Sequence, residues 1–127
     1  MPQLICHLLG DYVVQNHWMA TNKVRAWWPA IVHAAVYSLV FLLWLQPSWQ
    51  AMAVIFGTHA VIDRYRLAGY WVRFYGIGCE SWFQRYDREK CRGKAPEPAP
   101  PFLAVWLLII VDNTFHLAIN YAALRYL

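Results

Sequence analysis

The sequence WPAIVHAAVYSLVFLLWL occupies residues 28–45 and contains no Asp, Glu, Lys or Arg. Its length is close to the roughly 20 residues that a helix needs to cross the hydrocarbon core of a bilayer. Two aromatic residues, Trp27 and Trp28, and then Pro29 stand at its start, as is typical of a helix that enters a membrane through the interface. We therefore predict a transmembrane helix here.

The composition of the whole chain agrees with this prediction. Of 127 residues, 60% are hydrophobic and 14% are charged, and the chain holds eight Trp, eight Tyr and six Phe. This is too apolar for a soluble domain whose surface must face water. The net charge of +4 comes from basic residues that are segregated between apolar segments, which favours membrane topology over nucleic-acid binding. We predict an all-α, polytopic membrane helix bundle that forms one domain, residues 1–127.

Three further segments complete the predicted bundle. Residues 2–20 are moderately hydrophobic and would span only if other helices shielded their polar face. A turn with Ser48 as N-cap leads into a span over residues 49–65, and the last span covers residues 102–124. Residues 66–101 interleave basic and aromatic side chains, which is typical of a segment along a membrane interface. The prediction is therefore about four transmembrane helices plus a cytoplasmic interfacial segment.

The distribution of positive charge predicts the orientation. Every Lys and Arg except Arg125 either follows the first predicted span or lies between Arg64, at the end of the third span, and the start of the fourth, and the turn after the second span has none. The positive-inside rule assigns the basic side to the cytoplasm. We expect a multi-pass protein of the bacterial inner membrane, with basic loops in the cytoplasm and both chain ends outside. We also expect no cleaved signal peptide, because the first 20 residues lack a charged start and carry polar residues.

Pairs of His and Asp recur inside these apolar segments at a spacing of four residues, and they are His7 with Asp11, His59 with Asp63, and Asp112 with His116. Four residues is just over one helical turn, so each pair lies on one face of its helix. In the predicted topology, each aspartate lies on the cytoplasmic side of its histidine, although the last helix runs in the opposite direction. The three pairs could therefore share one layer of the bundle.

A metal ion would account for this polar layer. A carboxylate in the hydrocarbon region costs several kcal/mol unless it is paired, protonated or coordinated. The candidate ligands are His7, Asp11, His33, His59, Asp63, Asp112 and His116. Imidazole and carboxylate together suit a divalent metal, with Zn preferred and Mn or Fe as alternatives. A proton or ion path stays open as another interpretation, because membrane relays use the same side chains.

Further polar residues extend the candidate site. Gln15 and Asn120 continue two of the helix faces and suit hydrogen bonds to a ligand or to the substrate. Arg64, Arg66 and Arg73 follow Asp63 and could lie near lipid phosphates. Ordinary positive-inside anchoring explains these arginines equally well.

Several longer motifs contain these polar residues, and they are HLLGDYVVQNHWMATNK (7–23), His33 in WPAIVHAAVYSL, GTHAVIDRYRLAGYW (57–71) and VDNTFHLAIN (111–120). Together they resemble a family of small bacterial and phage inner-membrane proteins that is classed as a domain of unknown function, and the resemblance covers nearly all of the chain outside residues 76–100. It implies a four-helix membrane architecture with a polar centre and no established activity. The HxxxD spacing is more remotely similar to that of zinc-dependent phospholipase C and of predicted membrane-bound metal-dependent hydrolases.

If the site is catalytic, hydrolysis is the natural chemistry. A bound metal activates water, and an aspartate that is not a ligand can act as general base, with Asp11, Asp63 and Asp112 as the candidates. A substrate reached from the inner leaflet would be a phospholipid or a polyprenyl phosphate. The alternative is a non-enzymatic phage or prophage membrane protein, such as a pore, a lysis protein or a superinfection-exclusion factor. Assembly into a homo-oligomer, which could complete a site or a pore, is left open.

Overall fold

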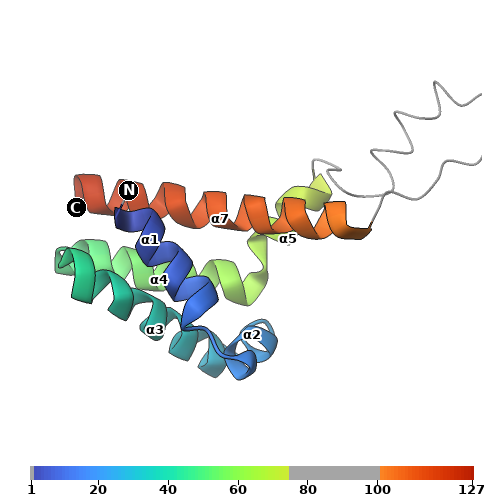
Figure 1. Cartoon of the computed structure of the whole chain (residues 1–127), viewed down its shortest axis with the longest axis horizontal. Helices are drawn as coiled ribbons and strands as arrows, with labels where there is room; N and C mark the ends of the chain where they lie inside the picture. Colours follow the sequence, from blue (N-terminus) through green and yellow to red (C-terminus); the bar gives the residue numbers. More distant parts are fainter. Residues whose placement is uncertain (1, 75–100) are drawn as a thin grey trace, which may run out of the picture. The chain divides into compact units, whose positions relative to one another are not determined.

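The structure, a computed structural model, describes residues 2–74 and 101–127 (Figure 1). The described residues form six α-helices and one π-helical turn and contain no strand. The elements are α1 (Pro2–Leu8), η1 (Leu9–Val13), α2 (His17–Asn22), α3 (Trp27–Leu45), α4 (Trp49–Tyr65), α5 (Leu67–Phe74) and α7 (Pro101–Tyr126). The chain divides into two compact units, Met1–Arg66 with Thr114–Leu127, and Leu67–Asn113. The all-α class predicted from the sequence is confirmed.

The central hairpin of the first unit agrees closely with the sequence prediction. α3 and α4 pack against each other, and their bounds differ by at most one residue from the predicted spans. Gln46 ends α3 in the left-handed conformation, with φ of 48°. The Oγ of Ser48 then accepts a hydrogen bond from the backbone N–H of Ala51 at 3.1 Å, so the predicted N-cap is confirmed.

The first predicted span differs from the structure. Residues 2–20 do not form one helix, because α1 and η1 end at Val13 and α2 begins only at His17. Asn16 is extended, with φ of −86° and ψ of 168°, and its Oδ1 accepts the N–H of Met19 at 2.9 Å. This side-chain cap starts a new helix and replaces the backbone acceptor that a continuous helix would have provided.

The core of the first unit lies between α1, α3, α4 and the end of α7. Its buried apolar side chains are Cys6, Tyr37, Phe41, Ala51, Ile55 and Ala123. At the end formed by the α3–α4 turn, the Oγ of Ser48 donates to the carbonyl of Leu127 at 3.1 Å, so the end of the chain is held there. The elements of the first unit can be followed in Figure 1 from α1 in blue to the red end of α7.

Gly10 permits the close approach of the first helical segment to α3. A Cβ atom at this position would collide with the ring of Tyr37, whereas a Cβ at Gly57 on α4 would meet no atom within 4 Å. Gly10 is therefore required by packing, and Gly57 is not.

The second unit contains α5 and the start of α7, up to Asn113. α5 covers only the first part of the predicted interfacial segment, and its Tyr70, Trp71 and Phe74 are exposed. The remainder of that segment, residues 75–100, lies outside the described residues.

Two helices of the described chain are long and apolar enough to cross a membrane. They are α3, with 19 residues, and the 22-residue part of α7 from Val105 to Tyr126. This finding concerns length and composition alone, and a core helix of a soluble protein can meet the same criteria. Four spans, as predicted from the sequence, are not shown.

Candidate metal centre

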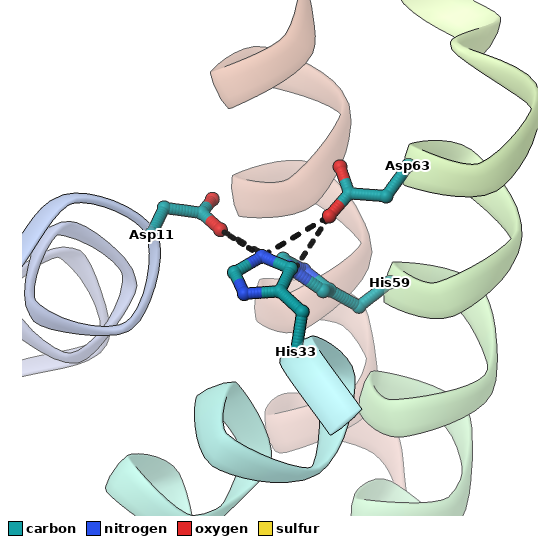
Figure 2. A group of neighbouring side chains, drawn as sticks. All are labelled: Asp11, His33, His59 and Asp63. Carbon is teal, nitrogen blue, oxygen red and sulfur yellow. Dashed lines mark hydrogen bonds and ion pairs between the residues drawn. The ribbon is translucent and has the colours of Figure 1, made fainter. Parts of the chain in front are cut away.

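Four buried side chains converge inside the first unit, and Figure 2 shows their ends turned toward one another. Asp11 comes from η1, His33 from α3, and His59 and Asp63 from α4. None of the four side chains is more than 8% exposed. Each could offer one ligand atom to a single ion, and those atoms lie within 4.8 Å of one another. The buried His/Asp group could therefore hold a metal ion.

Five of the six distances between these ligand atoms can be compared with the edges of a tetrahedral site. The Nε2 of His33 lies 3.1 Å from Asp11 Oδ1 and 3.1 Å from Asp63 Oδ2. The Nε2 of His59 lies 3.3 Å and 3.2 Å from the same two oxygens, and the two Nε2 atoms are 3.0 Å apart. A tetrahedron with ligands roughly 2.0–2.1 Å from a central ion has edges of about 3.3–3.4 Å. Five of the six edges are therefore close to the length that a tetrahedral ion requires.

Local helical geometry explains why these atoms meet. His59 and Asp63 are four residues apart on α4, so their side chains share a face. Asp11 lies in a π-helical turn, where the N–H of Val14 bonds to the carbonyl of Leu9 at 3.0 Å, five residues back. π-helical turns occur frequently at functional sites because the wider turn redirects side chains.

A second pair of histidines stands behind the two carboxylates. His7 Nδ1 is 3.4 Å from Asp11 Oδ2, and His116 Nε2 is 3.6 Å from Asp63 Oδ1. These oxygens are not the ones that face His33 and His59. His7 and His116, both predicted as ligands, are thus placed where they can orient the carboxylates that face the centre.

Tyr37 also contacts the histidines around the carboxylates, although the sequence analysis gave it no role. Its hydroxyl oxygen accepts from Asn120 Nδ2 at 2.6 Å and lies 2.9 Å from His7 Nδ1. Its ring stacks on His59, with centroids 3.7 Å apart and planes 17° apart. Tyr37 follows His33 by four residues on α3, so the same spacing rule that paired His with Asp would have identified it. Asn120, predicted to support the site, is placed in contact with this tyrosine.

Lys23 is the second residue that the sequence analysis missed. Its Nζ donates to Asp63 Oδ2 and to Gln15 Oε1, both at 2.9 Å, and lies 3.3 Å from His33 Nε2. The contact between Lys23 and Asp63 joins residues 40 positions apart, so no local spacing in the sequence indicates it. Gln15, predicted near the site, is placed beside it by this lysine.

The remaining predicted site residues are Arg64, Arg66, Arg73 and Asp112, and none of them belongs to the group of four buried side chains. The Nη1 of Arg64 donates to the carbonyl of Val24 at 2.7 Å, and Arg66 is exposed at the left-handed end of α4. Arg73 lies on α5, and its side chain is outside the described residues. Asp112 lies on the part of α7 that belongs to the second unit, where it is half-buried.

These features define a class, an all-helical protein with a buried His/Asp group that could hold a metal ion. A family model described as "Protein of unknown function (DUF3307)" matches residues 1–86, and the chain belongs to this family. The match includes the segments that carry Asp11, His33, His59 and Asp63 and ends before α7. No curated protein and no solved structure matches the chain.

Proposed function

We propose that this protein is a metal-dependent hydrolase of the bacterial inner membrane that acts on a phosphate-containing lipid. The observation that carries the proposal is the convergence of Asp11, His33, His59 and Asp63, whose ligand atoms all lie within 4.8 Å of one another. Two imidazole nitrogens and two carboxylate oxygens favour zinc, with manganese or iron as alternatives.

The distribution of polar and apolar side chains supports a membrane location. The buried residues of the first unit include His7, Asp11, His33, His59, Asp63, His116 and Asn120. Large apolar side chains on α3 are exposed instead, with Leu43 73% and Trp44 60% exposed. Large apolar side chains exposed to this degree would be costly in water and are natural in lipid. A buried polar centre in a membrane bundle marks a functional site by default.

The four-ligand set would be closed if every member bound the ion, whereas a hydrolytic site keeps one position for water. Asp63 is the ligand best suited to leave that position open. Lys23 lies 2.9 Å from its Oδ2, and His116 lies 3.6 Å from its Oδ1. We assign Asp11, His33 and His59 as the permanent ligands and Asp63 as the carboxylate that can accept a proton from water.

Hydrolysis of a phosphoester joins a water oxygen to phosphorus and breaks the phosphorus–oxygen bond to the alcohol. A bound divalent ion would make the water a stronger nucleophile and polarise a phosphoryl oxygen. Asp63 would take one proton from the attacking water and pass it to the oxygen of the departing alcohol, so the carboxylate is restored. His7 and Tyr37 keep Asp11 and His59 in place during this reaction.

The position of the site favours a lipid substrate at the inner leaflet. Lys23, Arg25, Arg64 and Arg66 gather near the end of α4 that carries Asp63 and in the loop before α3. The positive-inside rule places this end at the cytoplasmic surface, where lipid phosphates lie. A phospholipid or a polyprenyl phosphate therefore fits both the chemistry and the location.

One observation favours a second candidate function, a proton path. Asn120, Tyr37, His7, Asp11 and His33 form a continuous series of contacts of 3.4 Å or less. Such a series can pass protons between side chains. Proton leak through liposomes that contain the purified protein would favour this candidate, and a metal requirement without leak would favour the hydrolase.

The test is elemental analysis of detergent-purified protein together with hydrolysis of phosphatidic acid and polyprenyl phosphates. We expect about one zinc per chain in the parent, and loss of the metal in Asp11→Asn and in His33→Gln, because each removes a permanent ligand. His17→Gln is the matched control, since His17 is exposed on α2. Asp63→Asn should retain zinc with weaker affinity and lose turnover. Folded parent protein that holds no metal after reconstitution would contradict the proposal.

A further inference from the structure

Lys23 is more exposed to solvent than any of the four side chains that could hold the ion. Its side chain is 17% exposed, whereas those of Asp63 and His33 are 3% and 0% exposed. Its ammonium lies beside the edge that joins Asp63 to His33, at 2.9 Å from Asp63 Oδ2 and 3.3 Å from His33 Nε2. Lys23 is therefore a partly exposed residue that contacts two of the four candidate ligands, Asp63 and His33.

The position of Lys23 is fixed by its backbone and by a polar partner. Its N–H bonds to the carbonyl of Met19 at 2.9 Å and caps α2. The carbonyl of the next residue, Val24, accepts from Arg64 at 2.7 Å, which fastens the loop to α4. Gln15 Oε1 accepts a hydrogen bond from the ammonium of Lys23 at 2.9 Å. The backbone and the ammonium of Lys23 are thus both held by defined contacts, unlike those of a freely rotating surface lysine.

The partners of Lys23 indicate what it would bind. An ammonium donates three hydrogen bonds and accepts none. Gln15 accepts one of its hydrogen bonds, and the remaining donors point to Asp63 and His33. A metal ion bound to His33 would occupy the lone pair of its Nε2, so the N–H that faces His33 would need a new acceptor at the same edge, and an anionic oxygen of the substrate can provide it.

We propose that Lys23, held by Gln15, forms an anion subsite that binds a non-bridging phosphate oxygen at the open edge of the metal centre. This inference rests on the proposed function and adds to it a residue that recognises the phosphate group. Arg64 acts as a positioning residue, because it holds the loop that carries Lys23. The chemistry is shared by a lipid headgroup and by free phosphate.

The test is equilibrium dialysis of radiolabelled inorganic phosphate against the zinc-loaded full chain in detergent, with bound zinc measured on the same samples. Lys23→Met should weaken phosphate binding by about tenfold or more, because it removes a charge-assisted hydrogen bond. Its zinc affinity should stay equal or rise, because an ammonium that competes for Asp63 has gone. Lys23→Arg should recover much of the phosphate binding. Arg25→Met, which removes an exposed cation of the same loop, is the matched control and should change phosphate binding by less than about twofold.

The outcomes separate this inference from the proposed function. The subsite would be overturned if Lys23→Met bound phosphate as the parent does, or if Arg25→Met lost as much phosphate binding as Lys23→Met. It would also be overturned if Lys23→Met lost zinc together with phosphate. A zinc-loaded parent that binds no phosphate would overturn the subsite and leave the metal centre standing, whereas a parent without zinc would overturn both. Displacement of the label by phosphatidic acid at lower concentration than by unlabelled phosphate would support the subsite and identify the ligand as a lipid headgroup. Displacement by unlabelled phosphate alone would support the subsite and count against a lipid substrate.

Discussion

At the scale of single residues, a glycine determines how closely two helices of the metal centre approach. Gly10 faces the ring of Tyr37, and this ring stacks on His59 at a centroid distance of 3.7 Å. Asp11, the next residue, reaches His33 Nε2 at 3.1 Å. A larger residue at position 10 would push the first segment away from α3 and carry Asp11 out of the group.

Gly10→Ala should therefore destabilise the protein and impair the metal centre. The added Cβ collides with the ring of Tyr37, and overpacking of this kind costs about 1–3 kcal/mol. Gly57→Ala is the matched control, because the site on α4 has room and Ala favours a helix by about 0.5–1 kcal/mol over Gly. Thermal unfolding in detergent and zinc content provide the measurements. Equal stability and zinc content in the two variants would show that Tyr37 moves aside at no cost.

Residues of the candidate site differ in how far the sequence could predict them. His59 and Asp63 lie on one helix, so their spacing was sufficient, and their atoms approach to 3.2 Å. Lys23 reaches Asp63 across 40 residues, through a helix break that no periodicity reveals. Its positive charge led to the prediction of a cytoplasmic loop, and nothing in the sequence indicated its contact with the site.

At the scale of elements, the main difference between prediction and structure is the break between η1 and α2. The hydrophobic pattern of residues 2–20 supports a single helix, but hydrophobicity does not report a side chain that competes with the backbone. Asn16 does so by capping α2 at Met19. In contrast, α3 and α4 were predicted well, because their apolar runs end at a turn with a recognisable cap, Ser48.

Asn16→Ala should loosen α2 without disrupting the α3–α4 hairpin. Loss of an Asn cap costs about 1 kcal/mol of helix stability. The amide of Met19 loses its acceptor, so residues 17–22 should exchange hydrogen faster by mass spectrometry. Thr21→Ala is the matched control, since the Thr21 hydroxyl bonds within its own helix: it donates to the carbonyls of His17 and Trp18 and accepts from Asn22 Nδ2. If exchange in residues 17–22 is the same in both variants, Asn16 does not hold the start of α2.

At the scale of the whole molecule, most of the basic residues of the first unit lie at one end of the α3–α4 hairpin. Lys23 lies before α3, and Arg66 lies at the end of α4. The opposite end of the hairpin holds Ser48, which bonds to Leu127 at the end of the chain. Apart from Arg125, the basic residues of this unit lie at the end that carries Lys23 and Arg66, which is the end that the positive-inside rule assigns to the cytoplasm. The α3–α4 turn should therefore face the outside and the α2–α3 loop the cytoplasm.

Thiol labelling in intact bacteria tests this orientation. Gln50→Cys at the start of α4 and Ala26→Cys before α3 both replace exposed, uncharged residues, so neither changes the charge that directs insertion. The background carries serine at Cys79 and Cys91, while Cys6 is buried and can remain. A membrane-impermeant maleimide should label position 50 in intact cells and position 26 only after the inner membrane is opened.

Labelling of position 26 alone in intact cells would invert the topology and place the metal centre at the outer leaflet. Labelling of both positions in intact cells would mean that the α3 hairpin does not cross the membrane, and the exposed Leu43 and Trp44 would then have to be covered by another protein chain.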